Sequence, residues 1–203
     1  MASQELIETI VRYEDEDYMR AFMSDNCRFS MEELALPASH MHKQHLSMWP
    51  TRLLASYLDD LLRAKHEGRS LTLERTDLIF GNSHPGGVRD MFVARPFEYY
   101  GMIDYVVRIY LVWEAQARAK YQNVTANLLP MIEEEDTYGK PSFETLLRAL
   151  MLTFSPKTIS IYAAIVSSWW TERKNIMIDI YNRACYDRGW RSISDAEEAG
   201  KSL

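Results

Sequence analysis

The longest run of regularly spaced apolar residues lies between Ser155 and Arg188, and its pattern predicts one long helix. Ser155 followed by Pro156 is typical of a helix start, because the serine oxygen accepts from free N–H groups and proline has no N–H to leave unpaired. The apolar positions recur every three or four residues, as on one helix face, at Ile159, Tyr162, Ala163, Val166, Trp169, Trp170, Ile176, Met177, Ile180 and Ala184. We expect this helix to lie at the centre of the fold, and its length allows a kink.

The same spacing predicts further helices at residues 3–25, 50–66, 98–126 and 142–153. In the first of them, the acidic block from Glu14 to Asp17 interrupts the apolar face. We interpret this block as a solvated face, with a docking surface for a basic partner as the alternative. In the helix at 98–126, Glu114 and Arg118 have the spacing of an exposed ion pair.

Residues 71–93 are the only segment whose pattern favours extended structure. Leu71 and Leu73 alternate with polar residues, and short apolar runs lie on both sides of a glycine-rich loop at 81–87. Alternation around such a loop is typical of a β-hairpin.

Together these patterns predict a mainly α protein, a single-domain multi-helix bundle to which one small β-hairpin near 71–93 is an optional addition. We expect the domain to cover residues 1–203, beginning with an acidic N-terminal helical arm at 1–28. An acidic run that ends in glycine and proline predicts an internal linker loop at 130–141. The polar residues at 191–203 predict a flexible tail.

Composition restricts the classes of function. Apolar residues make up 47% of the 203 residues, which indicates a packed core rather than a disordered chain. The net charge of −6 argues against nucleic-acid binding over the whole surface. Two cysteines, Cys27 and Cys185, do not form a disulfide framework, and neither a signal peptide nor a transmembrane segment is visible. We therefore expect an intracellular protein.

Arg173 stands out among the candidate functional residues because it falls where the apolar face of the 155–188 helix predicts a hydrophobic residue. It could lay its methylene groups on the core and keep the guanidinium at the edge. Alternatively, it could be a buried charge that binds an acidic partner or an anionic ligand.

His40, His42 and His45 form a cluster, but only His42 and His45 have the spacing of metal ligands on one helix face. No cysteine or further histidine pair completes a site nearby, so these residues are weak candidates. We expect no metal site and no cofactor.

The loop before residue 98 offers a second group of candidates. His84, Arg89 and Arg95 could bind an anion, although the loop lacks the Lys-Ser/Thr of a phosphate-binding P-loop. A local basic groove for nucleic acid would have to come from Arg89, Arg95, Arg108, Arg118, Lys120, Arg173, Arg183, Arg188 and Arg191.

The sequence contains no catalytic motif that we can place, whereas its helices are rich in aromatic residues and methionine. We therefore expect a helical interaction or self-assembly protein, structural in role and without catalytic activity. The alternatives are a nucleic-acid-binding coat, nucleocapsid-like or regulatory protein, and an α-helical enzyme that depends on a metal or a small molecule.

Overall fold

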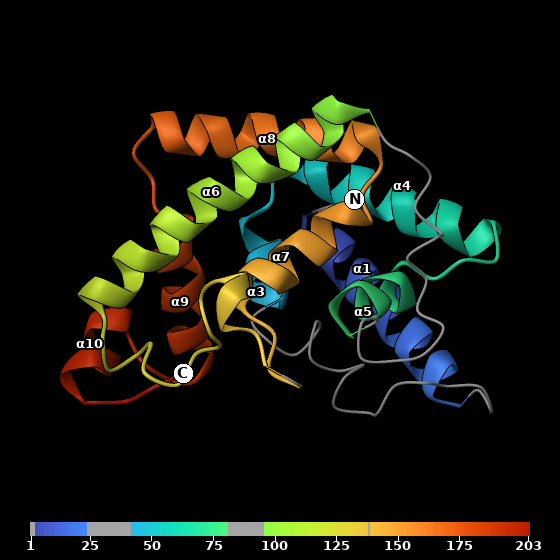
Figure 1. The fold of residues 1–203 in the computed structure, drawn as a ribbon. Helices are drawn as coiled ribbons and strands as arrows, with labels where there is room; N and C mark the ends of the chain where they lie inside the picture. The colour runs from blue at the N-terminus through green and yellow to red at the C-terminus, as the bar shows by residue number, and fades with distance from the viewer. Residues whose placement is uncertain (1–2, 24–41, 81–95, 138) are drawn as a thin grey trace.

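The computed structural model describes residues 3–23, 42–80, 96–137 and 139–203. These residues form nine α-helices and one 3-10 turn, and none of them lies in a β-strand, which confirms the predicted mainly α fold (Figure 1). Among the described helices, none combines the length and the apolar character that crossing a bilayer requires.

Three long helices pack together in the upper part of Figure 1, from which α6 runs diagonally down towards α10 (Ile193–Glu198). Helix α8 (Pro156–Thr171) packs against both α6 (Phe97–Lys120) and α4 (Thr51–His66). The start of α8 is the predicted one, since the Ser155 side chain accepts a hydrogen bond from the Thr158 N–H.

The prediction of one long helix over 155–188 is wrong. Helix α8 ends at Thr171, and a second helix, α9 (Ile176–Asp187), begins after a short turn. The N–H of Lys174 bonds to the Trp169 carbonyl and that of Arg173 to the Trp170 carbonyl, both at 3.0 Å. Arg173 has φ 57°, the left-handed conformation that closes many helix ends. Figure 1 shows α9 turning away from the axis of α8.

The hairpin predicted near 71–93 is not found in its described half, because Leu71–Phe80 is helix α5. Ser70 caps this helix by accepting from the Leu73 N–H at 3.2 Å. Leu71 and Thr72 are buried, and so are Arg75 and Thr76 one helical turn later. The alternation of Leu71 and Leu73 with polar residues was therefore a misleading indication of a strand, and residues 81–93 lie outside the described residues.

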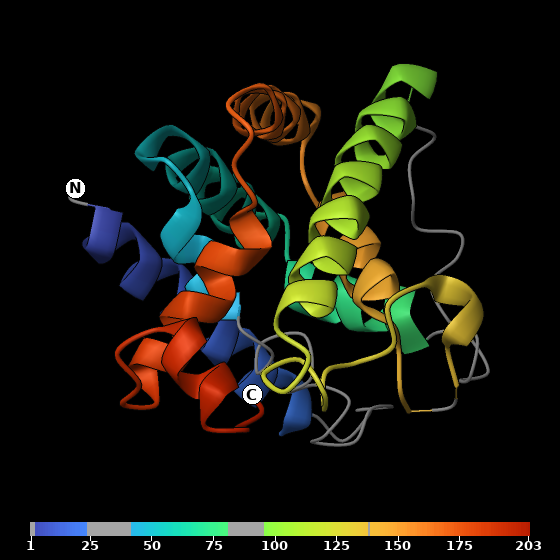
Figure 2. The same cartoon turned by 90° about the vertical axis from the view of Figure 1, so that its left-hand side faces the viewer.

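The remaining helices close the sides of the molecule. Helix α1 (Ser3–Phe22) packs against α4, α5 and the short α3 (His42–Met48), with Leu6, Ile7 and Ile10 in the core. Helix α7 (Phe143–Leu152) lies against α5 and α6 (Figure 2).

Parts of the segments predicted as a linker and a tail form regular elements. Among the described residues of 130–141, Glu133–Glu135 form a 3-10 turn and Thr137 pairs with Lys140 in an isolated β-bridge. The C-terminal residues include α10 (Ile193–Glu198), which packs against α9. Leu203 donates its N–H to the Val124 carbonyl at 2.9 Å, so the end of the chain lies against the loop after α6.

Candidate functional site

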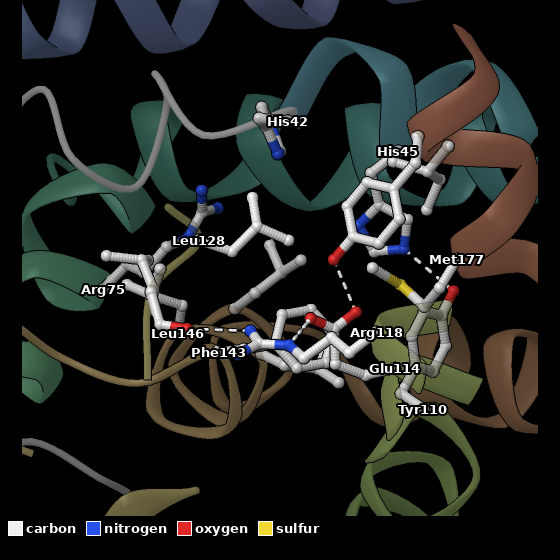
Figure 3. A pocket seen from close by; sticks show the side chains of 15 residues that line it. His42, His45, Arg75, Tyr110, Glu114, Arg118, Leu128, Phe143, Leu146 and Met177 are labelled. Carbon is white, nitrogen blue, oxygen red and sulfur yellow. Dashed lines mark hydrogen bonds and ion pairs between the residues drawn. The ribbon is translucent and has the colours of Figure 1, made fainter. Parts of the chain in front are cut away.

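A cavity of about 90 Å³ lies between α3, α5, α6, α7 and α9 (Figure 3). Its volume corresponds to the liquid volume of roughly three water molecules. Eight of its lining residues are apolar, and most of these come from α7 and α9. The polar lining residues are His42, His45, Arg75, Tyr110, Glu114, Arg118 and Tyr181.

Behind one side of the cavity, four helices converge on the buried carboxylate of Glu14. His42 Nε2 lies 2.8 Å from Glu14 Oε2, and the Tyr57 hydroxyl donates to Oε1 at 2.6 Å. Arg75 donates from Nη1 and Nη2 to the same Oε1 at 3.3 Å, and from Nη2 to the Tyr57 hydroxyl. We call these four residues the Glu14 cluster.

Glu14 is ionised in the folded protein. Burial alone would raise its pKa, but the charges of His42 and Arg75 and the hydrogen bonds from His42 and Tyr57 outweigh burial and lower the pKa to about 2. An ionised carboxylate can only accept hydrogen bonds, so His42 Nε2 carries a proton.

Arg75 is incompletely satisfied although its side chain is only 2% exposed. Its Nε has no hydrogen-bond partner among the described residues. Arg75 also lines the cavity, but its Nε is enclosed by protein atoms. Buried polar groups in proteins nearly always have a partner, and an unmade hydrogen bond costs about 1–3 kcal/mol.

A second group at the cavity consists of His45, Tyr110 and Tyr162. His45 Nε2 lies 2.9 Å from both hydroxyls, and Tyr162 donates to the Tyr110 hydroxyl at 2.7 Å. Burial, with a smaller contribution from the charge of His42, lowers the pKa of His45 to about 3. His45 is therefore neutral at physiological pH and able to accept a hydrogen bond from the Tyr110 hydroxyl.

The third group is an ion pair on α6 that the sequence analysis had placed on the surface. Glu114 is fully buried, accepts from Arg118 Nε at 2.6 Å, and accepts from the Tyr181 hydroxyl on its other oxygen. Arg118 also donates from Nη2 to the Leu129 carbonyl at 2.8 Å. Burial and the neighbouring Glu114 raise the pKa of Tyr181, so its hydroxyl stays protonated.

The cavity reaches the surface on the side of Arg118. Arg118, Leu128, Leu129, Phe143 and Leu146 are partly exposed. On the opposite side, Glu14 and Tyr57 lie behind Arg75 and His42, which are buried. Figure 3 shows Arg75 and His42 apart from the Glu114–Arg118 pair, with apolar side chains between them. The cavity therefore has a buried polar end and an apolar body.

The structure separates the residues that the sequence suggested for binding and for metal. Arg173 is exposed in the turn between α8 and α9, so it does not lie on a buried helix face, and its binding of an acidic partner or an anionic ligand stays a prediction. His42 and His45 have different partners, and the described residues contain no cluster of three or more His, Cys, Asp or Glu side chains suited to a metal ion. His40, His84, Arg89 and Arg95 lie outside the described residues.

Several arginines proposed for a basic groove have carboxylate partners four residues away along the chain. Arg118 pairs with Glu114, Arg183 with Asp187, and Arg191 with Asp195. Such pairing reduces the charge that these residues offer to phosphates. Nucleic-acid binding through such a groove stays a prediction.

Sequence reasoning missed the charged residues that matter most at this site. Glu14 continues the series Ile7, Ile10 and Tyr18 on the inner face of α1, and Arg75 lies one turn after Leu71 on α5. A charged residue at the helical spacing of an apolar face indicates that its side chain is buried. For Glu14 this indication is masked by the three acidic residues that follow it. For Arg75 it is lost because the alternation of Leu71 and Leu73 favours a strand.

Comparison with known proteins identifies a family but no activity. Neither the curated proteins nor the solved structures show a match to this chain. Residues 4–198 match the profile of the family described as protein of unknown function (DUF4125). Because the match covers nearly all of the 203 residues, the chain belongs to the DUF4125 family.

Proposed function

We propose that this protein binds a small organic molecule in the cavity between α3, α5, α6, α7 and α9. The observation that carries the proposal is the cavity itself, whose largely apolar wall contains a few buried polar side chains, among them Arg75 and Glu114. A bound molecule would remove the apolar part of this wall from contact with water.

The composition of the wall supports the proposal. Small-molecule sites in proteins are mostly apolar and contain a few polar groups that fix the orientation of the ligand. Here the apolar side chains of α7 and α9 face Arg75, His42 and Glu114. Ionisable residues with strongly shifted pKa values, such as His45, also concentrate at functional sites.

A binding experiment with two isosteric probes tests this function. Butyrate and butanamide are titrated into the protein, and binding is followed by calorimetry and by the thermal unfolding midpoint. We expect at least one probe to bind and to raise the midpoint, because a ligand that binds only the folded state stabilises it.

Matched variants locate the binding. Leu147 is buried and lines the cavity, so Leu147→Phe should fill the space and abolish binding. Leu62 is exposed on α4, so Leu62→Phe should leave binding unchanged. The absence of binding by both probes, or binding that survives Leu147→Phe, would overturn the proposal.

Self-association is a second candidate, carried over from the sequence. Large side chains are exposed on the neighbouring helices α6 and α8, among them Phe97 at 86% and Trp170 at 44%. Exposed aromatic side chains are enriched at protein interfaces, which supports this candidate.

A further inference from the structure

We propose that the ligand of this cavity is a small, neutral and apolar molecule, which packs on the side chains of α7 and α9 and needs no hydrogen bond from the wall. This inference rests on the proposed function and adds the chemical class of the ligand. Three features of the cavity support it.

The first feature is that the guanidinium groups of the wall are paired with carboxylates. Arg75 bonds to Glu14 and Arg118 bonds to Glu114, so each guanidinium has a carboxylate of its own. The second oxygen of Glu114 accepts from the Tyr181 hydroxyl. A charged ligand would give up its hydration without gaining a free counterion, which is costly away from water. The paired charges therefore favour a neutral ligand over an anion or a cation.

The second feature is that the neutral polar groups also have partners within the protein. His45 Nε2 lies 2.9 Å from the hydroxyls of Tyr110 and Tyr162, and Tyr162 donates to the Tyr110 hydroxyl. The Nε of Arg75 has no partner among the described residues, but it is enclosed by protein atoms. A polar ligand would have to compete with existing hydrogen bonds, and an amide or hydroxyl that is buried without one is destabilising. A ligand without such groups avoids this cost.

The third feature is the apolar surface that the ligand would cover. Leu147, Leu150, Met177 and Ile180 line the cavity and are buried in the protein. Figure 3 shows the Met177 side chain at this wall. Cavities of about 150 Å³ with walls of Leu, Ile and Phe stay dry and bind benzene or xenon. This cavity, of about 90 Å³, has space for a somewhat smaller molecule of the same character.

Three molecules of nearly the same shape distinguish the possible classes of ligand. Butyrate is charged, butanamide is neutral and polar, and isohexane carries an isopropyl group in place of the amide. Each is added at the same concentration, below the solubility of isohexane, and the shift in the thermal unfolding midpoint is measured in sealed cells. Headspace gas chromatography measures isohexane binding directly.

We expect isohexane to bind at least about tenfold more tightly than butanamide, because the amide loses its hydrogen bonds to water on entering the cavity. Butyrate should bind most weakly of the three, since a charge is still more costly to bury than an amide. Isohexane binding should also be lost in Leu147→Phe, which fills the cavity.

A polar substitution in the wall tests the cause of this preference. Leu146 lines the cavity and is only partly buried, so Leu146→Asn keeps the size of the side chain and adds an amide. This variant should bind isohexane several-fold more weakly and butanamide at least as tightly as the unmodified protein, because two amides can form a hydrogen bond. Leu152→Asn is the matched control, since Leu152 is partly buried on the same helix but lies outside the cavity wall, and it should leave both affinities unchanged.

The outcomes distinguish this inference from the proposed function. Butanamide or butyrate binding as tightly as isohexane would overturn the apolar ligand and leave the small-molecule site standing. Equal losses of isohexane binding in Leu146→Asn and Leu152→Asn would show that the preference does not come from the cavity wall, and would also overturn the inference. The three molecules on the unmodified protein decide the question if Leu146→Asn does not fold. Absence of binding by all three would remove the proposed function itself.

Discussion

Glu14 shows how much one buried charge can contribute to a helical protein of this size. Its side chain is 2% exposed, and its partners come from α3, α4 and α5. Removing one member of a buried charged group is far more damaging than removing an exposed pair, because the remaining charges lose their compensation in a medium of low dielectric constant.

We expect Glu14→Gln to lower the free energy of unfolding by about 3–5 kcal/mol, because it leaves the buried guanidinium of Arg75 without a countercharge. Urea unfolding at neutral pH measures this loss. Glu16→Gln, two residues away on the exposed face and paired with Lys65, should change stability by about 0.5 kcal/mol or less. Equal losses in the two variants would contradict the burial of Glu14.

The lowered pKa of Glu14 also predicts acid sensitivity. A carboxyl group with a folded pKa of about 2, against an ordinary value of 4.5, contributes stability that is fully present above pH 4.5. This stability, about 3 kcal/mol, is lost as the pH falls from 4.5 towards 2. Unfolding curves at pH 5 and pH 3 should therefore differ less in Glu14→Gln than in the unmodified protein.

His45 makes the free energy of unfolding depend on pH in a second, higher pH range. Its folded pKa of about 3 lies below the ordinary 6.5, so its stabilising neutral form is fully populated above pH 6.5 and the contribution is lost as the pH falls towards 3. Between pH 6.5 and pH 5, we expect His45 to contribute a loss of about 2 kcal/mol. Unfolding experiments on His45→Gln should show that this part of the pH dependence is gone, and an unchanged slope would contradict a buried neutral His45.

At the scale of single residues, the sequence predicted apolar burial better than polar burial. Ile159, Tyr162 and Val166 are buried as their spacing indicated. The burial of Glu114 was not predicted, because an i, i+4 pair looks the same on a solvated face as inside a cavity wall. Only the neighbouring helices, which supply Tyr181, distinguish the two environments.

Among the elements, the break between α8 and α9 shows the limit of periodicity. The segment from Glu172 to Asn175 contains neither glycine nor proline, so local residue preferences did not mark a helix end. Asn175 caps α9 by accepting from the Ile178 N–H at 3.2 Å and donates to the Trp113 carbonyl at 3.0 Å. The second of these bonds reaches α6, which a local pattern cannot indicate.

We expect Arg173→Gly to raise the free energy of unfolding by up to about 1 kcal/mol. A left-handed conformation costs an L-residue roughly 1–2 kcal/mol, and glycine removes this cost while losing more backbone entropy on folding. Urea unfolding compares this variant with Lys174→Gly, which lies in the same turn without a left-handed φ. Lys174→Gly should be neutral or destabilising, and the same effect in both variants would contradict the proposed strain at Arg173.

For the molecule as a whole, helical spacing was sufficient to predict the class of fold. It did not predict the cavity, because its walls come from helices on both sides of the chain midpoint, from His42 on α3 to Tyr181 on α9. Such a site depends on the relative placement of whole helices. Its residues are recognisable only after the packing is known.

Self-association also belongs to this scale. If the exposed aromatic residues of α6 and α8 form an interface, the mass measured by light scattering should exceed 23.7 kDa at high protein concentration. Phe97→Asp should then return the protein to a monomer without lowering its thermal unfolding midpoint, since Phe97 is 86% exposed. A strict monomer at all concentrations, across pH and salt, would rule out this candidate.

The convergence of four helices on Glu14 has a consequence for the kinetics of folding. Its partners are 28, 43 and 61 residues away in the chain, so the carboxylate cannot be fully compensated until α1, α3, α4 and α5 have all docked. Before that stage, water solvates the charge better than a half-formed core can. We expect Glu14→Gln to accelerate unfolding and to leave the folding rate nearly unchanged in stopped-flow experiments, the behaviour of contacts that form after the transition state. The Glu14 carboxylate, whose protonation lowers stability in acid, would then also determine how long the native state persists before it unfolds.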